Sequence, residues 1–303
     1  MGQDGDWARR GTENVEEEQR AGYWRYVRSA MFKKLGTGML LVWLGPAGFL
    51  AAGLRAQQTT AQADSVDNGT VPAAPARAAS DALPGVKDVV SKGVEALGGR
   101  EAWMRSTSRR MKGMFQSEDS STFVGIEILQ KLPNKSLTKV TLPNGVVIRE
   151  VCDGKAVWIE DPRGGYHPFT GPSQAFRLKQ EALLANMTTF DLAANGKLIG
   201  VQKVGTHTTY VVEFAENKNL TSRLYFDQDT WLVARTEDVF TTPDGPYMVR
   251  MDLEDYRDVD GLKFPFRIKR MEKGAVTTVR LTQISVNPEI DDTIFLKPET
   301  ARN

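Results

Sequence analysis

The feature that most constrains the fold is a long series of short segments in which apolar and polar residues alternate, each bounded by turn residues. In one of them, Val249, Met251 and Leu253 alternate with Arg250, Asp252 and Glu254. A period of two residues is typical of a β-strand with one buried face. About ten or eleven such segments follow one another at hairpin spacing, one pair joined by a predicted type I′ turn at Asp153-Gly154. The sequence therefore predicts a mainly β (α+β) chain, an up-and-down antiparallel sheet that curls into a barrel or half barrel.

Two helical segments accompany the strands. The first begins at about Val86 and ends at Gly98-Gly99, because apolar residues recur there at spacings of three and four and glycine can terminate a helix. The second lies in residues 171–188, where Ser173 is a suitable N-cap. Two helices are enough to cover one concave face. We therefore expect one face of the curved sheet to be covered by helices and the other to be in contact with water.

The stretch DYRDVDGLKFPFRIKRMEKG, residues 255–274, has three aspartates close to a glycine and invites comparison with a calcium loop. An EF-hand loop needs oxygen ligands at its first, third and fifth positions, glycine at its sixth and a carboxylate at its twelfth. With Gly261 in the sixth position, Tyr256 is first and Arg267 is twelfth. Two ligand positions fail, so we interpret Asp260-Gly261 as a hairpin turn and expect no metal site.

The N-terminal region predicts export. Lys33 and Lys34 precede an uncharged run at residues 35–54, and Ala61-Gln62-Ala63 offers a small-x-small cleavage site. This is the layout of a secretory signal peptide. An uncleaved anchor is the alternative, because about 20 apolar residues can span a bilayer.

The domain organisation follows from these composition shifts. Residues 1–30 form a polar extension that precedes a second candidate start, Met31, and residues 31–63 form the signal peptide or signal anchor. Residues 64–84, rich in Ala and Pro, form a flexible linker. Residues 85–303 form the β domain. We expect a periplasmic protein, anchored by residues 35–54 if the signal is not cleaved.

Composition argues against several enzyme classes. The chain has one cysteine, Cys152, and two histidines, His167 and His207, which leaves little material for metal or acid–base chemistry. Serine-nucleophile, zinc-protease and P-loop motifs are absent from the sequence. The formal net charge of +1 gives no reason to expect nucleic-acid binding. We expect a protein that is not an enzyme and uses no cofactor and no metal.

Two basic stretches, residues 105–112 and 267–273, are interpreted as solvated strand faces rather than as sites for nucleic acid or anionic lipid, since they alternate with apolar residues. His207 shares a strand face with Glu213 and is expected to be exposed. Large apolar and aromatic residues are the more useful indication. An incompletely closed barrel has a cavity that side chains or an apolar ligand must fill. The candidate ligand-binding residues are Trp103, Trp158, Phe176, Leu183 and Tyr210.

Four phrases carry a resemblance to a known family: VEALGGREAW, LYFDQDTWLVARTE, DYRDVDGLKFPFRI and SVNPEIDDTIFLKPE. Together they resemble bacterial envelope proteins of the outer-membrane lipoprotein-sorting (LolA-like) superfamily, over residues 85–298 and most clearly in the C-terminal half. The matching residues are hairpin signatures and not catalytic ones. Trp231 stands where the family often has glycine, which indicates a modified turn or an exposed aromatic residue.

The resemblance implies an unclosed antiparallel barrel whose concave side is covered by helices and whose apolar interior accepts acyl chains. It further implies a carrier or binder of lipoprotein acyl chains or another lipid, with the helix in residues 173–186 acting as a lid, and it allows an envelope protein partner. The alternative is a non-catalytic structural or sensory interaction module of the bacterial envelope. The sequence does not identify the ligand, the partner or the oligomeric state.

Overall fold

The computed structural model describes residues 83–160, 162, 165–170, 174, 177–178, 182–242, 245–272 and 274–297 of the 303-residue chain. The N-terminal extension, the signal segment and all but the last two residues of the linker lie outside the described residues, as does Ser173. Among the described residues, no helix is both long and apolar enough to cross a bilayer.

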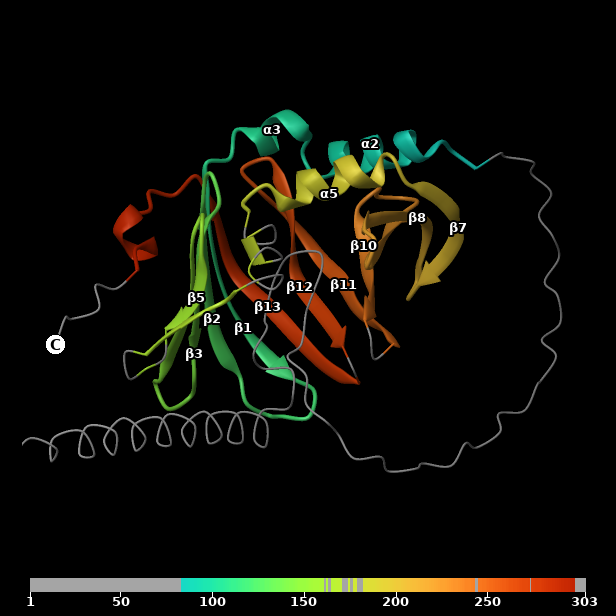
Figure 1. Ribbon diagram of the computed structural model, residues 1–303. Helices are drawn as coiled ribbons and strands as arrows, with labels where there is room; N and C mark the ends of the chain where they lie inside the picture. Colours follow the sequence, from blue (N-terminus) through green and yellow to red (C-terminus); the bar gives the residue numbers. More distant parts are fainter. Residues whose placement is uncertain are drawn as a thin grey trace, which may run out of the picture.

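Thirteen strands of the described chain form one antiparallel sheet that does not close into a barrel (Figure 1). Its strand order is β6-β5-β4-β3-β2-β1-β13-β12-β11-β10-β9-β8-β7. Two up-and-down meanders are thus joined by the pairing of β1 with β13, and the opening lies between β6 and β7. The strands are β1 Ser108–Ser117, β2 Val124–Lys131, β3 Lys135–Thr141, β4 Val147–Asp153, β5 Val157–Glu160, β6 Tyr166–Pro168, β7 Lys197–Val204, β8 His207–Asn217, β9 Leu220–Asp227, β10 Val233–Thr242, β11 Gly245–Val259, β12 Leu262–Glu272 and β13 Ala275–Val286.

Three α-helices lie together across one side of the curved sheet: α2 (Val86–Ala96), α3 (Arg100–Met104) and α5 (Ala185–Ala193) (Figure 1). Helix α2 ends where the glycine pair predicts, because Gly98 and Gly99 adopt positive φ angles of 110° and 84°. Arg100 of α3 forms an ion pair with Asp191 of α5. The predicted fold class, a curved and unclosed antiparallel sheet with helices over its concave face, is confirmed.

The second helix differs from its prediction. Gln174, Arg177 and Leu178 are helical, as predicted for residues 171–188, but the chain then turns and a separate helix, α5, begins at Ala185 and ends at Ala193. Ala182 to Leu184 form a turn rather than the middle of a helix. Strands β6 and β7 were also missed, because β6 has only three residues and β7 is a sheet-edge strand with few buried residues.

The main core lies between the helices and the concave face. Ile126 and Ile128 of β2 belong to it, together with Val89 of α2 and Phe190 of α5. A second cluster covers the convex face of β2–β5, where Leu129 packs with residues of the C-terminal segment. That segment includes the 3-10 helix η1 (Asp292–Phe295), and the cluster's buried members are Leu137, Val151, Trp158, Ile290 and Phe295.

Two hairpin turns test the turn assignments. Asp260 and Gly261 have φ angles of 53° and 80°, and Val259 pairs with Leu262, so the predicted hairpin at Asp260-Gly261 is confirmed. At Asp153-Gly154 the hairpin is confirmed, but the two-residue type I′ turn is wrong. The loop is longer, since Cys152 pairs with Val157. The Asp153 carboxylate shapes it by accepting hydrogen bonds from the backbone N–H groups that follow, at 2.8 and 2.7 Å.

The turn after β9 is modified, as Trp231 indicated. Trp231 has a φ angle of 61° and its ring stacks on Tyr210 at a centroid distance of 5.7 Å. Lys92 of α2 lies over the same ring at 4.3 Å. The aromatic residue is therefore half-buried under α2 rather than exposed.

Candidate ligand-binding cavity

A cavity lies between the helices and the concave face of the sheet. The space open to the centre of a water molecule is about 100 Å³, and the total empty space, counted out to the solvent-facing mouth, is about 840 Å³. Its walls come from the segment α2–α3, from α5 and from strands β1 and β9–β13, and its lining residues are Leu97, Trp103, Arg109, Met111, Asn186, Thr189, Phe190, Leu224, Val233, Thr236, Met251, Leu253, Tyr256, Lys263, Phe264, Pro265, Ile268, Leu281 and Ile284.

Strand pairing explains why the apolar side chains converge. Leu224 of β9, Thr236 of β10 and Met251 of β11 are direct partners across the sheet, so their side chains lie on one face. The right-handed twist and curvature of an antiparallel sheet then turn that face inward. Fourteen of these nineteen lining residues are apolar or aromatic, so the floor is apolar.

Trp103 forms part of the helical side of the cavity. Its side chain is 1% exposed, and its indole Nε1 donates a hydrogen bond to the Leu97 carbonyl at 3.1 Å. Its ring meets the edge of Phe264 at a centroid distance of 5.0 Å. The buried N–H is thus satisfied, which leaves the rest of the ring as apolar surface.

Arg109 of β1 is the buried cation of the cavity wall. The side chain donates from Nε and Nη2 to Gln130 Oε1 at 3.1 and 2.6 Å, and from Nη2 to the Leu183 carbonyl at 3.4 Å. Its guanidinium lies 5.7 Å from the centroid of Trp103 and 5.5 Å from that of Phe264. Burial lowers the pKa of Arg109 from its ordinary value to about 10, which leaves the group protonated at neutral pH.

The remaining polar groups of the wall are few. Tyr256 donates its hydroxyl to the Val233 carbonyl at 2.9 Å, and burial raises the pKa of this phenol, so it is neutral. The Thr236 hydroxyl is buried and has no hydrogen-bond partner in the described chain. Lys263 also belongs to the lining, and its backbone N–H donates to the Leu97 carbonyl at 3.0 Å. Within the described part of the chain, no lining residue carries a carboxylate.

The five residues that the sequence proposed as ligand-binding lie in different parts of the structure. Trp103 lines the cavity, whereas Leu183 is buried beside it and offers its carbonyl to Arg109. Tyr210 stacks on Trp231 at the margin of the main core. Trp158 belongs to the cluster on the convex face. Phe176 lies outside the described residues.

Sequence reasoning missed Arg109 and Thr236. Arg109 stands in the first basic stretch, which was interpreted as a solvated face. That interpretation holds for Arg110 and Lys112, but Arg109 is in phase with the buried Met111 and so lies on the opposite face. The alternation of apolar and polar residues along β1 could have shown that Arg109 lies on the buried face.

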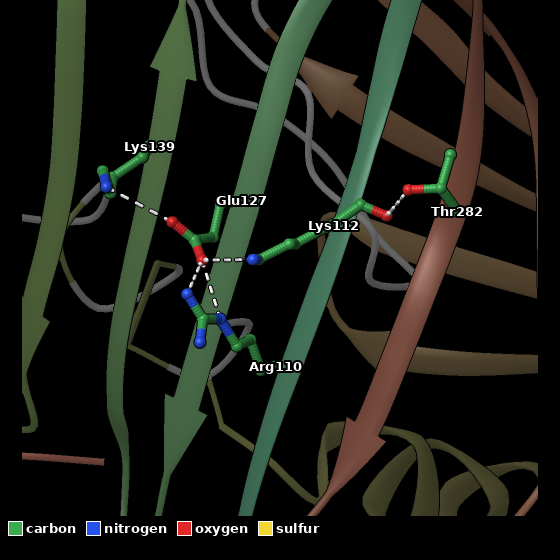
Figure 2. A network of polar contacts seen from close by, with 5 residues as sticks. All are labelled: Arg110, Lys112, Glu127, Lys139 and Thr282. Carbon is green, nitrogen blue, oxygen red and sulfur yellow. Dashed lines mark hydrogen bonds and ion pairs between the residues drawn. The ribbon is translucent and has the colours of Figure 1, made fainter. Parts of the chain in front are cut away.

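The outer face of the same strands carries a polar network (Figure 2). Glu127 of β2 accepts from Arg110 Nε at 2.7 Å and from Lys139 Nζ at 3.2 Å, and Lys112 Nζ lies 4.0 Å away. Burial alone would raise the pKa of Glu127, but these hydrogen bonds and the two cations lower it below its ordinary value. Thr282 of β13 donates to the Lys112 carbonyl at 3.2 Å. The convex face is therefore solvated and ion-paired around Glu127, whereas further along the same strands the apolar cluster covers it.

His207, predicted to be exposed, has a side chain that is 56% exposed and also bonded, since its Nδ1 lies 2.8 Å from the Asp227 carboxylate. Within the described ranges, no group of three or more His, Cys, Asp or Glu side chains is arranged to hold a metal ion. Among its described lining residues the cavity offers mostly apolar surface, together with the buried guanidinium of Arg109 and the unpartnered hydroxyl of Thr236.

The sequence matches no protein-family model, and no curated protein is significantly similar to it. Solved structures do share the fold. A DUF1329 family protein from Desulfovibrio piger superposes with a TM-score of 0.50 at 12% identity, over 71% of this chain and 98% of that one. At this identity the likeness concerns the fold alone.

Two further solved structures align with this chain over nearly their whole length. A LolA superfamily protein from Nitrosomonas europaea has a TM-score of 0.48 at 16% identity, over 71% of this chain and 99% of that one. An outer-membrane lipoprotein-sorting protein domain from Vibrio parahaemolyticus has a TM-score of 0.47 at 10% identity, over 68% and 97%.

Proposed function

We propose that this chain is an exported envelope protein that binds an apolar ligand, the acyl chain of a lipidated protein or of another lipid, in the cavity between the helices and the concave face. The observation that carries the proposal is the apolar cavity itself, which the fold leaves between two layers that would otherwise pack together. The signal-like N-terminal sequence and the LolA-like resemblance support the same role.

The energetics favour an acyl chain. Burial of one methylene stabilises a complex by about 0.8 kcal/mol, so a long chain held in an apolar site competes with a membrane. Trp103, Phe190 and Phe264 supply flat apolar surface on both sides of the space.

The cavity is too small to enclose a whole acyl chain unless the helical layer moves. Pockets that enclose a drug-sized ligand usually have volumes of about 300–1,000 Å³. The space that a water-sized atom can occupy here is about 100 Å³, so a whole acyl chain requires the helical layer to move outward. Helix α5 is the proposed lid. It lies in the connection between the two free ends of the sheet, and the exposed ion pair Arg100–Asp191 joins it to α3.

The test is to purify the full chain, extract it with organic solvent and identify bound lipid by mass spectrometry, and then to measure binding of a fluorescent fatty-acyl probe. A matched pair of variants on β1 locates the site. Met111→Trp fills the cavity and is expected to weaken probe binding, whereas Met114→Trp, at a residue that is 38% exposed and outside the lining, leaves it unchanged.

Two results would contradict the proposal. One is a protein that carries no lipid and binds no acyl probe. The other is probe binding that Met111→Trp and Met114→Trp weaken equally, because the probe would then bind elsewhere. Specific capture of an envelope protein by a chain without lipid would favour the interaction module instead.

A further inference from the structure

The buried guanidinium of Arg109 is not matched by a negative charge. Within the described part of the chain no carboxylate lies within ion-pair distance of it; its hydrogen-bond partners are the neutral oxygens of Gln130 and Leu183. Burying a charge is costly unless it is paired. The rings of Trp103 and Phe264 offset a part of that cost by cation–π attraction, but they do not supply a counter-charge.

We propose that the cavity selects ligands in which an anionic oxygen headgroup, a carboxylate or a phosphate, is attached to an apolar chain, and that Arg109 binds the headgroup. This selectivity rests on the ligand-binding function proposed above and narrows its ligand class.

The hydrogen-bond pattern of Arg109 leaves donors for such a group. Nε and Nη2 both point to one oxygen, Gln130 Oε1, while Nη1 has no acceptor among the described residues. A guanidinium presents its N–H groups in a planar fork that matches carboxylate and phosphate oxygens. Gln130 and the two rings fix that plane in advance, so little side-chain freedom is lost when an anion binds.

The rest of the wall is consistent with an anionic amphiphile. Among the described lining residues, none is acidic. Between Arg109 on β1 and Thr236 on β10 lie three strands, β13, β12 and β11, whose contributions to the wall are mostly apolar. An acyl chain whose headgroup lies at Arg109 therefore runs over apolar surface toward the unpartnered Thr236 hydroxyl.

A purely structural role for Arg109 predicts something different. Through its bond to the Leu183 carbonyl, Arg109 also ties the segment before α5 to the sheet. Loss of that bond would weaken the binding of every apolar ligand alike. Only a headgroup contact makes the affinity for an acid differ from the affinity for its ester.

The experiment compares laurate, dodecyl phosphate and methyl laurate as competitors of a fluorescent acyl probe on the full chain. The wild-type protein is expected to bind laurate or dodecyl phosphate about 10- to 100-fold more tightly than methyl laurate, the range that a hydrogen bond to a charged group provides. Arg109→Met should abolish this preference, and Arg109→Lys should retain part of it. Arg110→Met, the neighbouring arginine on the outer face, should leave it intact.

Each outcome decides a separate point. Equal affinity of the wild-type protein for laurate and its methyl ester overturns this inference and leaves the proposed function standing. Failure of all three competitors to bind overturns the proposed function. Binding of inorganic phosphate as tightly as dodecyl phosphate would also overturn the inference, since the alkyl chain of the ligand would then contribute nothing to the affinity. If Arg109→Met does not fold, the wild-type ratio and Arg109→Lys still decide it.

Discussion

His207 Nδ1 lies 2.8 Å from Asp227 Oδ2, and this contact joins the start of β8 to the end of β9. The Asp227 side chain is 4% exposed, and its other oxygen accepts from the backbone N–H and the hydroxyl of Thr230, both at 2.7 Å. One buried carboxylate thus holds a histidine on one strand and the turn that carries Trp231.

This arrangement predicts an acid-sensitive fold. Burial by itself raises the pKa of Asp227, but the hydrogen bonds from Thr230 and His207 outweigh it, and the pKa is lowered. A lowered carboxylate pKa stabilises the fold above the unfolded-state value of about 3.9, and this contribution is lost as pH falls through the folded-state value. Asp227→Asn should lower the free energy of unfolding at pH 7 by about 1–3 kcal/mol, measured by urea denaturation.

The deficit of Asp227→Asn should shrink as the pH is lowered below about 4, because the carboxyl of the unfolded wild-type chain is protonated there and that of the folded chain follows at a lower pH. Asp229→Asn is the control in the same turn: this side chain is exposed, and the substitution should change stability by less than about 0.5 kcal/mol. A deficit that stays constant from pH 7 to pH 3 would contradict the role given to the Asp227 charge.

Gly93→Ala should destabilise the protein even though alanine has the higher helix propensity. Replacing an interior glycine by alanine usually favours a helix by about 1 kcal/mol. A Cβ at Gly93 would, however, lie 2.4 Å from the ring of Phe226, which is fully buried in the main core. Forced overpacking costs about 1–3 kcal/mol, so Gly93→Ala should lower the thermal midpoint.

The control for this prediction lies two residues earlier in the same helix. Ser91 is exposed, so Ser91→Ala should raise the midpoint slightly through propensity alone. If Gly93→Ala stabilised the protein as much as Ser91→Ala, α2 would not pack on Phe226 as closely as the structure has it.

A pair of identical substitutions tests the unpartnered hydroxyl of the cavity. Thr236 Oγ1 has no hydrogen-bond partner in the described chain, whereas Thr209 Oγ1 donates to the Gln202 carbonyl at 2.8 Å. Thr236→Val should leave the free energy of unfolding unchanged or raise it, because no bond is lost and a buried polar group is removed. Thr209→Val should lower it by about 0.5–1.5 kcal/mol, measured by urea denaturation. An equal loss in the two variants would mean that the Thr236 hydroxyl has a partner after all.

The strand pattern made most of the sheet predictable. Alternation and turn residues located β11 and β12, and the Asp260-Gly261 hairpin between them followed from turn chemistry. Short or weakly apolar strands were not predicted from the sequence, and the reason is physical. An edge strand such as β7 has few buried positions, so its sequence carries little alternation.

The cavity was less predictable than the sheet. In β2, Ile128 faces the main core and Leu129 faces the convex cluster, so both faces are apolar. Alternation separates two faces, but it does not tell which one the curvature turns inward. Trp158 is in register with Val151 and Leu137 and so follows Leu129 to the convex side. Trp103, which comes from a helix above the concave face, was free of this ambiguity.

The gap between β6 and β7 gives the sheet a mechanical property that a closed barrel lacks. In a closed barrel, the number of strands and their stagger fix the diameter, and widening it breaks backbone hydrogen bonds. Here the two ends of the sheet are not bonded to each other, so a small change of twist at each strand pair spreads them apart while every ladder stays intact. We therefore expect the distance between β6 and β7 to vary more easily than the diameter of a closed barrel.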